Sequence, residues 1–351
     1  MKINSFRNIA GMAMVGALGL LSSVTSAVAA DVVILKLHQF LPGQATVPKQ
    51  VLQVWGAKIE EQSKGRIKIQ HYPSMQLGGK PPELIDQVID GVVDIIWTVN
   101  GYTPGRFPRT EVFELPFIQK DAQETTQALW TMFEKDMKDN EFKDMHVLGV
   151  WVHGPGLLHS DKPVKTVEDM KGLKVRGGSR AINMMLKQFG ATAVGMPVPA
   201  VSEALSKGVI NATTIPWEVA AAVKVPELVS NHTEFTGNAL YTVTFVMAMN
   251  KEKYASLPDD LKKIIDDNSG LEFSVNAAKI MQDFDAPVRA KAVEQGNNII
   301  VLNADESAVW AAAAAPVYDT WAKEMDDKGF DGKALIAEAK ALLLKSSKMS
   351  N

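Results

Sequence analysis

The sequence places one arginine where it could bind an anion. Arg176 closes a short segment, Lys174–Arg176, whose pattern predicts a strand. Ligands of open α/β sheets bind in the crevice beyond the carboxyl ends of the strands. A guanidinium there offers two parallel N–H donors to a carboxylate, in a geometry that lysine cannot copy. We therefore predict that Arg176 binds a ligand carboxylate; the alternative is a solvated arginine at an exposed strand end.

Large aromatic residues are expected at the same rim. Phe40, Trp97 and Trp151 end or directly follow predicted strands, and Trp217 comes shortly after another one. Such side chains supply flat apolar walls to ligand pockets. Each of them could instead belong to the core, and we expect at least two of the four in the cleft.

Polar side chains near these positions complete the predicted site. Asn100, Tyr102 and His153 are expected to be neutral partners for a second polar group on the ligand. Glu218 would repel an anion if it lined the site. We therefore expect its carboxylate to interact with backbone N–H groups at the start of a helix.

The sequence offers little that could catalyse a reaction. It contains no dinucleotide-binding or phosphate-binding glycine motif, no Gly-x-Ser-x-Gly and no cysteine, and its six histidines never fall at His-x-x-x-His spacing. His153 and His159 flank a Gly-Pro-Gly turn and could form a metal pair, although histidines satisfied within the turn are the favoured interpretation. We expect a binding protein without cofactor or metal.

The first thirty residues have the pattern of a secretory signal peptide. Lys2 and Arg7 precede an apolar run over residues 9–21, and small residues end the segment at Ala30. An N-terminal anchor is the alternative, but the run is short for a membrane span. We expect export, cleavage and a periplasmic protein that does not insert in the membrane.

Charge excludes other partners. Without Lys2 and Arg7 the chain has 35 basic against 40 acidic residues, a formal net charge of −5. Such a balance attracts neither nucleic acid nor anionic lipid.

Hydrophobic periodicity predicts two units of the same design. Each unit alternates strands with helices and therefore predicts a parallel sheet. In both, a glycine ends the second helix and an apolar strand follows. The predicted strands are 32–38, 67–69 and 92–96, then 174–176, 192–194 and 209–212, and the helices between them are 47–59, 82–89, 179–189 and 199–207.

Extended apolar segments and helices are expected to join the two units. Residues 147–153 and 241–249 are long enough to cross from one sheet to the other. Helices are predicted over 258–296, 304–325 and 332–345. We expect lobe I to comprise 31–150 plus about 245–290, and lobe II to comprise 151–244 plus about 291–351.

Ordered motifs in the second unit resemble a known family. The segment Val167–Arg176 reads Val-Glu-Asp-Met-Lys-Gly-Leu-Lys-Val-Arg, and Phe189-Gly190-Ala191, Met196-Pro197 and Gly208–Asn211 follow it. These motifs resemble the solute-binding subunits of tripartite ATP-independent periplasmic (TRAP) transporters. The resemblance implies an α/β fold of two Rossmann-like lobes joined by two crossover strands and a long helix, like a type II periplasmic binding protein. It also implies a carboxylate clamp at Arg176 and membrane permease subunits as partners.

One segment departs from the family and bears on the ligand. Many relatives carry Gly-Gln-Glu-Asn-Pro where this chain has Ala212-Thr213-Thr214-Ile215-Pro216, so Thr214 is expected in a wall poor in amide and acid groups. A dicarboxylate would need a second cation, for which Arg180 is the obvious candidate. We predict an aromatic monocarboxylate such as benzoate or a hydroxybenzoate, with short 2-hydroxy or 2-oxo acids next.

Two other functions fit the same sequence. An extracytoplasmic sensor of an organic acid could use the same fold and present its closed form to a signalling protein. A periplasmic hydrolase or lyase would need a base and a nucleophile in the cleft.

Overall fold

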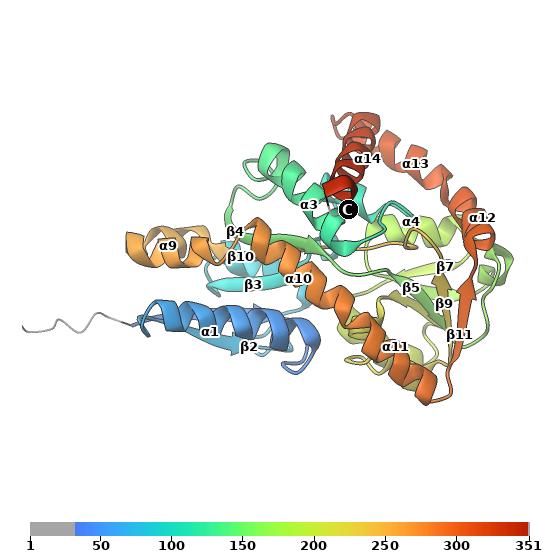
Figure 1. The fold of residues 1–351 in the computed structure, drawn as a ribbon, viewed down its shortest axis with the longest axis horizontal. Coiled ribbons are helices and arrows are strands. Elements are labelled where there is room, and N and C mark those ends of the chain that lie inside the picture. Colours follow the sequence, from blue (N-terminus) through green and yellow to red (C-terminus); the bar gives the residue numbers. More distant parts are fainter. Residues whose placement is uncertain (1–31, 350–351) are drawn as a thin grey trace, which may run out of the picture. The chain divides into compact units, whose positions relative to one another are not determined.

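The computed structural model describes residues 32–349. The predicted signal peptide, residues 1–30, lies outside them. The described chain contains two mixed β-sheets with helices packed around them (Figure 1). None of the helices in this part of the chain combines the length and apolarity needed to cross a membrane.

The first sheet has the strand order β2-β1-β3-β10-β4. β1 pairs in parallel with β2 and β3, whereas β10 is antiparallel to β3 and β4. All five residues of β3 are buried, as expected for a central strand covered on both faces. The strands are β1 (Val33–Gln39), β2 (Ile67–Tyr72), β3 (Ile95–Val99), β4 (Met145–Val152) and β10 (Thr244–Asn250).

Helices cover this sheet where the sequence pattern places them. The π-helical turn η1 runs into α1, which packs on β2, and α2 packs on β3 and β10. Asp121 caps α3 by accepting hydrogen bonds from the backbone N–H groups of Gln123 and Glu124, at 2.9 and 3.0 Å. The elements are η1 (Val47–Leu52), α1 (Gln53–Gln62), η2 (Pro81–Glu83), α2 (Leu84–Ile89), η3 (Asn100–Tyr102), η4 (Thr110–Glu114), α3 (Ala122–Met132), η5 (Phe133–Met137) and α8 (Lys251–Ala255).

The second sheet has the order β11-β9-β5-β8-β6-β7. β6 is parallel to β7 and β8, and β5 is antiparallel to both β8 and β9. Its strands are β5 (Leu157–Ser160), β6 (Lys174–Gly177), β7 (Thr192–Gly195), β8 (Ala212–Ile215), β9 (Asn231–Phe235) and β11 (Asn298–Leu302), and its helices are η6 (Val167–Met170), α4 (Arg180–Gln188), η7 (Val198–Ala200), α5 (Val201–Ser206), α6 (Trp217–Ala220) and α7 (Val225–Leu228).

Corresponding strands of the two sheets begin later than the sequence predicts, and for the same reason. Gly91 and Gly208 both adopt positive φ, 69° and 67°, and the chain forms a further turn before its residues pair with a neighbouring strand. Val92 is consequently 58% exposed and Val209 50% exposed, while the next residue of each is buried. The strands therefore start at Ile95 and Ala212, three residues after the predicted starts at 92 and 209.

Three connections join the two sheets. Residues 153–156 lead from β4 to β5, residues 236–243 lead from β9 to β10, and α10 (Leu271–Asp283) continues into α11 (Asp285–Glu294). α10 packs on β4 and α3, whereas α11 packs on α6. Figure 1 shows α10 and α11 running end to end past both sheets.

The predicted long helix over 258–296 is wrong in detail, because the chain forms three helices there. Gly270, with φ 88°, separates α9 (Asp259–Asp267) from α10, and Phe284 separates α10 from α11. In the same way Pro316 divides the predicted helix 304–325 into α12 (Ala304–Ala314) and α13 (Pro316–Asp326), since proline cannot donate within a helix. The last helix, α14 (Gly332–Met349), packs on α13 and α3.

The contact between the two extended connections generates a test of the fold. The N–H of Gly156 donates to the carbonyl of Tyr241 at 3.0 Å, and a Cβ atom on Gly156 would overlap the Tyr241 ring. We expect Gly156→Ala to lower the free energy of unfolding by about 1–3 kcal/mol, because the connections would have to move apart. Denaturant titration measures this change.

Gly43→Ala is the matched control. A Cβ atom at Gly43 meets the Pro73 side chain at an ordinary 3.5 Å. We expect this variant to unfold within about 1 kcal/mol of the parent. Equal effects of the two substitutions would contradict the close approach at Gly156.

Candidate ligand-binding site

A cavity with about 430 Å³ of space between atoms lies where the two sheets and their connections meet. The carboxyl ends of parallel strands of both sheets open on it, as the rule for α/β sheets requires. Most lining side chains are apolar. The lining residues are Phe40, Leu41, Trp97, Val99, Tyr102, His153, Arg176, Gly178, Val198, Ile215, Pro216, Glu218, Val219, Tyr241, Val243, Phe245 and Met281.

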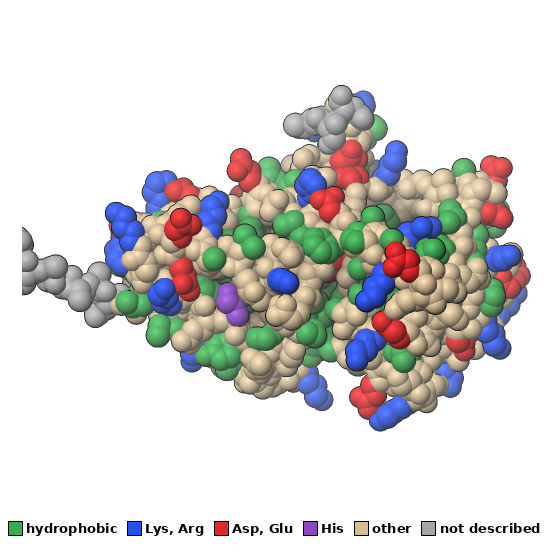
Figure 2. Space-filling view, turned by 60° about the horizontal axis from the view of Figure 1, so that its bottom comes forward, with side chains coloured by type: hydrophobic (Ala, Val, Ile, Leu, Met, Phe, Trp, Pro, Cys, Tyr) green, Lys and Arg blue, Asp and Glu red, His purple; other side chains and the backbone are tan. Residues whose placement is uncertain are grey.

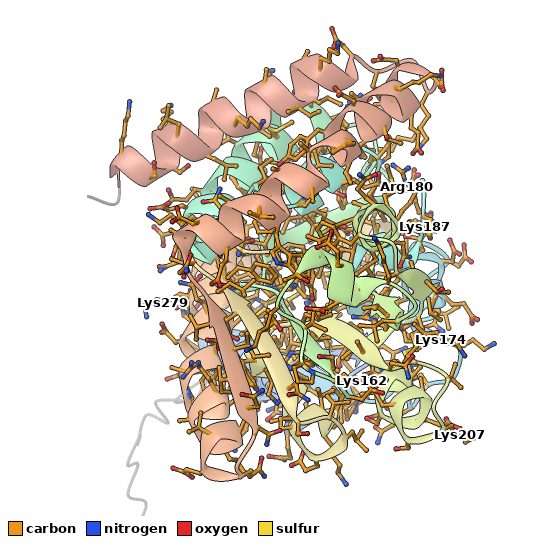
Figure 3. The ribbon with its side chains drawn as sticks, turned by 90° about the vertical axis from the view of Figure 1, so that its right-hand side faces the viewer. Lys162, Lys174, Arg180, Lys187, Lys207 and Lys279 are labelled. Atoms are coloured by element: carbon orange, nitrogen blue, oxygen red, sulfur yellow. The ribbon has the colours of Figure 1, made fainter. Side chains whose placement is uncertain are left out.

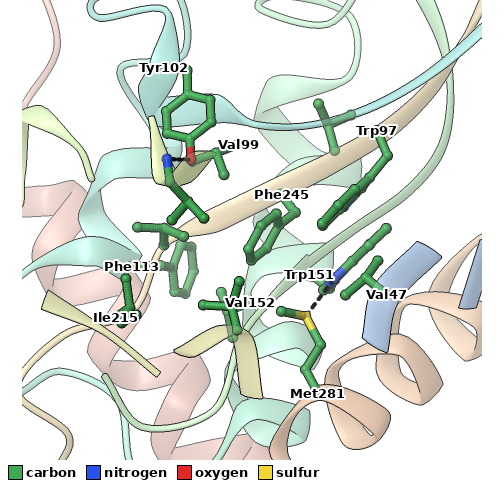
Figure 4. Close-up of a cluster of buried hydrophobic side chains, with 14 of the residues drawn as sticks. Val47, Trp97, Val99, Tyr102, Phe113, Trp151, Val152, Ile215, Phe245 and Met281 are labelled. Carbon is green, nitrogen blue, oxygen red and sulfur yellow. Dashed lines mark hydrogen bonds between the residues drawn. The ribbon is translucent and has the colours of Figure 1, made fainter. Parts of the chain in front are cut away.

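Stacked aromatic rings form one wall of the cavity. The Trp97 ring is stacked between those of Phe40, at 4.8 Å between centroids, and Phe245, at 5.4 Å. Tyr102 meets Phe40 edge-on at 5.6 Å. Trp151 lies behind this wall, stacked on Trp97 at 6.4 Å, and its Nε1 donates to the sulfur of Met281 (Figure 4). The wall therefore presents a flat apolar surface to the cavity, and packing against Trp151 on its other side holds the rings in position.

Arg176 brings a buried positive charge to the cavity. The residue is only 3% exposed. Its Nε donates to the carbonyl of Met196 and one Nη to the carbonyl of Thr214, both at 2.9 Å, and the Thr214 hydroxyl donates back to the carbonyl of Arg176 at 3.0 Å. Within residues 32–349 no carboxylate forms an ion pair with this guanidinium. A buried cation without a counter-ion is costly, so the geometry favours an anionic ligand.

His153 lines the cavity, but both of its ring nitrogens are engaged. Nδ1–H donates to the carbonyl of Gly154, and Nε2 accepts from the N–H of Val243 at 3.2 Å. Burial lowers the pKa of His153 to about 4, helped by the charge of Arg176. The imidazole is therefore neutral and presents its ring, rather than a free nitrogen, to the cavity.

Three other residues predicted for the site do not line this cavity. Asn100 donates to the Thr244 hydroxyl at 3.1 Å, and Thr214 holds Arg176. Trp217 donates from Nε1 to Glu234 at 2.8 Å. Its ring packs against the buried histidines of the second sheet, because neighbouring residues of the short helix α6 point to different sides.

Glu218, the next residue of α6, lines the cavity instead. At the start of α6 a backbone N–H group is bound by the carboxyl of Asp285, and not by that of Glu218 as expected. This group is the N–H of Glu218, at 2.8 Å. The Glu218 side chain is buried, and burial raises its pKa to about 7. The sequence reasoning also missed Tyr241 and Phe245 as lining residues, although their alternation on a crossover segment was visible and could have revealed them.

Other cations of the second sheet are paired or point away from the cavity. Arg180, the candidate for a second clamp, forms ion pairs with Glu111 and Glu324. Figure 3 shows Lys174, Lys187 and Lys207 along one side of the molecule and Lys279 on the opposite side, and these side chains and that of Lys162 are exposed. Arg176 is thus the one cation that lines the cavity among residues 32–349.

The histidine pair considered for a metal does not form. His159 instead shares a hydrogen bond of 2.7 Å with His232, in the core of the second sheet. No group of three or more histidine or acidic side chains within the described range could hold a metal ion. On the face that Figure 2 shows, acidic and basic side chains are interspersed, and no patch of one sign stands out.

Comparisons with known proteins identify the family. Residues 39–324 match Bacterial extracellular solute-binding protein, family 7. A TRAP solute-binding protein of Rhodoferax ferrireducens T118, solved with benzoate, is 49% identical with a TM-score of 0.89, and the match covers 91% of this chain and 100% of that one. A marine metagenome TRAP protein, solved with 3-hydroxybenzoate, is 45% identical with a TM-score of 0.88, covering 90% and 99%.

A relative of known name gives a more distant match. The outer membrane transporter protein TsaT of Comamonas testosteroni is 27% identical over 305 residues, 86% of this chain and 89% of that one. Together the matches confirm the predicted TRAP resemblance, the two-lobed fold and a binding rather than an enzymatic protein. The chain belongs to family 7 of the bacterial extracellular solute-binding proteins, the family of the TRAP solute receptors.

Proposed function

We propose that this chain binds an aromatic monocarboxylate in the periplasm and delivers it to the membrane subunits of a TRAP transporter. The observation that carries the proposal is the buried guanidinium of Arg176, which has no acidic partner among residues 32–349 and faces an aromatic-lined cavity. A carboxylate would pair with the guanidinium, and an aromatic ring would cover the wall of Phe40, Trp97 and Phe245.

The relatives support the same ligand class. The two similar solved proteins hold benzoate and 3-hydroxybenzoate. The pairing of Arg180 with two glutamates argues against a dicarboxylate, because no second cation of the described chain is then free at the cavity. Sugar acids would bury several hydroxyls against apolar side chains, at a cost of about 1–3 kcal/mol for each unmatched group. A short 2-hydroxy or 2-oxo acid would leave most of the aromatic wall uncovered.

Within this proposal the predicted site residues take different roles. Arg176 binds the carboxylate, Phe40, Trp97 and His153 contact the ring, and Thr214 holds the guanidinium in place. Asn100 and Trp217 support the walls from outside the cavity. Tyr102, which was expected at the site, lines the cavity, and Tyr241 and Phe245 are added as lining residues.

Export and lobe boundaries are also part of the proposal. Removal of residues 1–30 would leave a periplasmic receptor, like the periplasmic relatives of the family. Each sheet would form the core of one lobe, with lobe I at 31–150 plus about 245–290 and lobe II at 151–244 plus about 291–351. Helix α14 belongs to the second range but packs on α3 of the first, so it would touch both lobes. Delivery is preferred to the sensor alternative, because the similar solved proteins are TRAP receptors.

The Arg176 clamp can be tested by calorimetry with benzoate. We expect Arg176→Ala to weaken binding by about 2–5 kcal/mol, because the ligand carboxylate would be desolvated without a counter-ion. Arg176→Lys should recover only part of the loss, since an ammonium group cannot form the paired hydrogen bonds.

Lys174→Ala is the control for the loss of one positive charge from the same strand. Its side chain is exposed and lies two residues before Arg176. We expect it to bind benzoate within about twofold of the parent. An Arg176→Ala protein that binds benzoate within about threefold of the parent would refute the clamp.

Closure of the lobes is the second expectation. Two contacts already join elements around the first sheet to elements around the second. The Tyr102 hydroxyl accepts from the N–H of Val198 at 2.9 Å, and Arg180 of α4 forms an ion pair with Glu111 of η4. The connections through residues 153–156 and 236–243 are extended and could act as a hinge. We expect small-angle scattering to give a smaller radius of gyration with saturating benzoate than without. Identical profiles would contradict a hinge.

A further inference from the structure

Glu218 is a buried acid that the carboxylate clamp does not use. It lines the same cavity as Arg176 and is 3% exposed. Neither of its carboxyl oxygens has a well-formed hydrogen bond within the described chain. Native proteins rarely leave buried polar atoms without a partner, so such a group at a ligand cavity requires an explanation.

The other polar side chains around the cavity are mostly satisfied by the protein itself. Both nitrogens of His153 are engaged, and the Tyr102 hydroxyl accepts a backbone N–H. Arg176 donates to two carbonyls, which fix its orientation. Besides Glu218, the lining side chain with an unpartnered buried polar atom is Trp97, through its Nε1.

Glu218 and Arg176 belong to different walls of the cavity. Arg176 comes from the end of β6, and its charge acts on Tyr102, Tyr241 and His153. Glu218 comes from α6, and its side-chain neighbour is Thr46, which precedes η1. A ligand whose carboxylate is held by Arg176 would therefore direct another part of its ring toward Glu218.

The surroundings of Glu218 favour its neutral form. Burial raises its pKa to about 7, and the Thr46 hydroxyl opposes the shift only in part. The acids behind it are Asp285, whose own pKa is raised by burial, and Glu234, which is paired with Arg289. An anionic ligand would favour protonation of Glu218 further. A protonated carboxyl offers one O–H donor and an acceptor oxygen, which together match a hydroxyl group.

We propose that Glu218 determines specificity by hydrogen-bonding an uncharged hydroxyl on the ring of the aromatic acid whose carboxylate Arg176 binds. This inference rests on the proposed function. A ring without the hydroxyl leaves the buried carboxyl unpaired, whereas a hydroxylated ring satisfies it. Sites built to bind a hydroxyl discriminate strongly against the analogue that lacks one.

Calorimetry at pH 6 with benzoate and with 2-, 3- and 4-hydroxybenzoate tests the inference. We expect the parent to bind one hydroxybenzoate at least about tenfold more tightly than benzoate, because this ligand supplies the missing partner. Glu218→Leu should reduce that preference to about threefold or less, because the ligand hydroxyl loses its partner. Glu218→Gln, which is neutral and keeps a donor and an acceptor, should retain most of the preference.

The pH dependence separates a Glu218 that faces the ligand from a structural role. Raising the pH from 6 to 8.5 ionises Glu218, which repels either carboxylate ligand but still accepts the hydroxyl proton, so the parent should bind both benzoate and the preferred hydroxybenzoate more weakly and keep its preference. In Glu218→Gln both affinities should stay constant. Arg176, His153, Asp285, Glu234 and Arg289 are the same in both proteins and cannot produce the difference between them.

The outcomes distinguish this inference from the proposed function. A cooperative thermal unfolding transition of Glu218→Leu shows that the variant is folded. If the parent binds benzoate without preferring any hydroxybenzoate, or if Glu218→Leu keeps the preference, the role of Glu218 is wrong and the proposed function stands. If the parent binds none of the four acids, the proposed function itself is wrong.

Discussion

The binding site depends on the positive charge of Arg176, which the fold buries without a counter-ion among the described residues. Arg176 loses its hydration on folding and gains in return two backbone carbonyls, of Met196 and Thr214, but no carboxylate among the described residues. Neutral acceptors orient a guanidinium without cancelling its charge. The protein therefore holds a fixed, desolvated cation, and the binding energy of an anion can be realised there with little reorganisation.

The rest of the fold can be understood as support for this charge. β6 brings Arg176 to the edge of the second sheet, and the parallel neighbour β8 supplies the Thr214 carbonyl that holds it. β3 and β10 of the first sheet present Trp97 and Phe245 as a stacked wall across the cavity. The cavity thus needs both sheets, and the three connections between the sheets join its two walls.

Sequence reasoning predicted the parts of the site that follow from strand topology. Arg176 and Phe40 stand near or just beyond the carboxyl ends of β6 and β1, and the carboxyl edge of a sheet is a fixed place in an α/β fold. Trp97 was expected just after a strand and is instead the middle residue of β3, because this strand lies three residues later than predicted. The choice between Trp217 and Glu218 could not be made in this way. Both stand in the four-residue helix α6, and which of them faces the cavity depends on how α6 packs against α11, a contact between segments far apart in the chain.

The same distinction applies to the fold. Strand and helix order and the repeated design follow from hydrophobic period and glycine positions. The segments 147–153 and 241–249, which were predicted to cross between the sheets, lie mostly in β4 and β10 of the first sheet, and the chain crosses at 153–156 and 236–243. The late starts of β3 and β8 come from the additional turn after Gly91 and Gly208, and the division of the long helix at Phe284 lies just before Pro287, which stands in the first turn of α11 and cannot donate within a helix. The period of the apolar residues alone does not show these boundaries.

The central claim is that charge, and not only an apolar pocket, holds the ligand. Calorimetric titration of the unmodified protein with benzoate and with benzamide tests it directly, because the two molecules share ring and shape and differ in the anionic group. The account predicts that benzoate binds at least about 100-fold more tightly, since only the carboxylate neutralises the buried guanidinium. Binding of benzamide within about threefold of benzoate would contradict it.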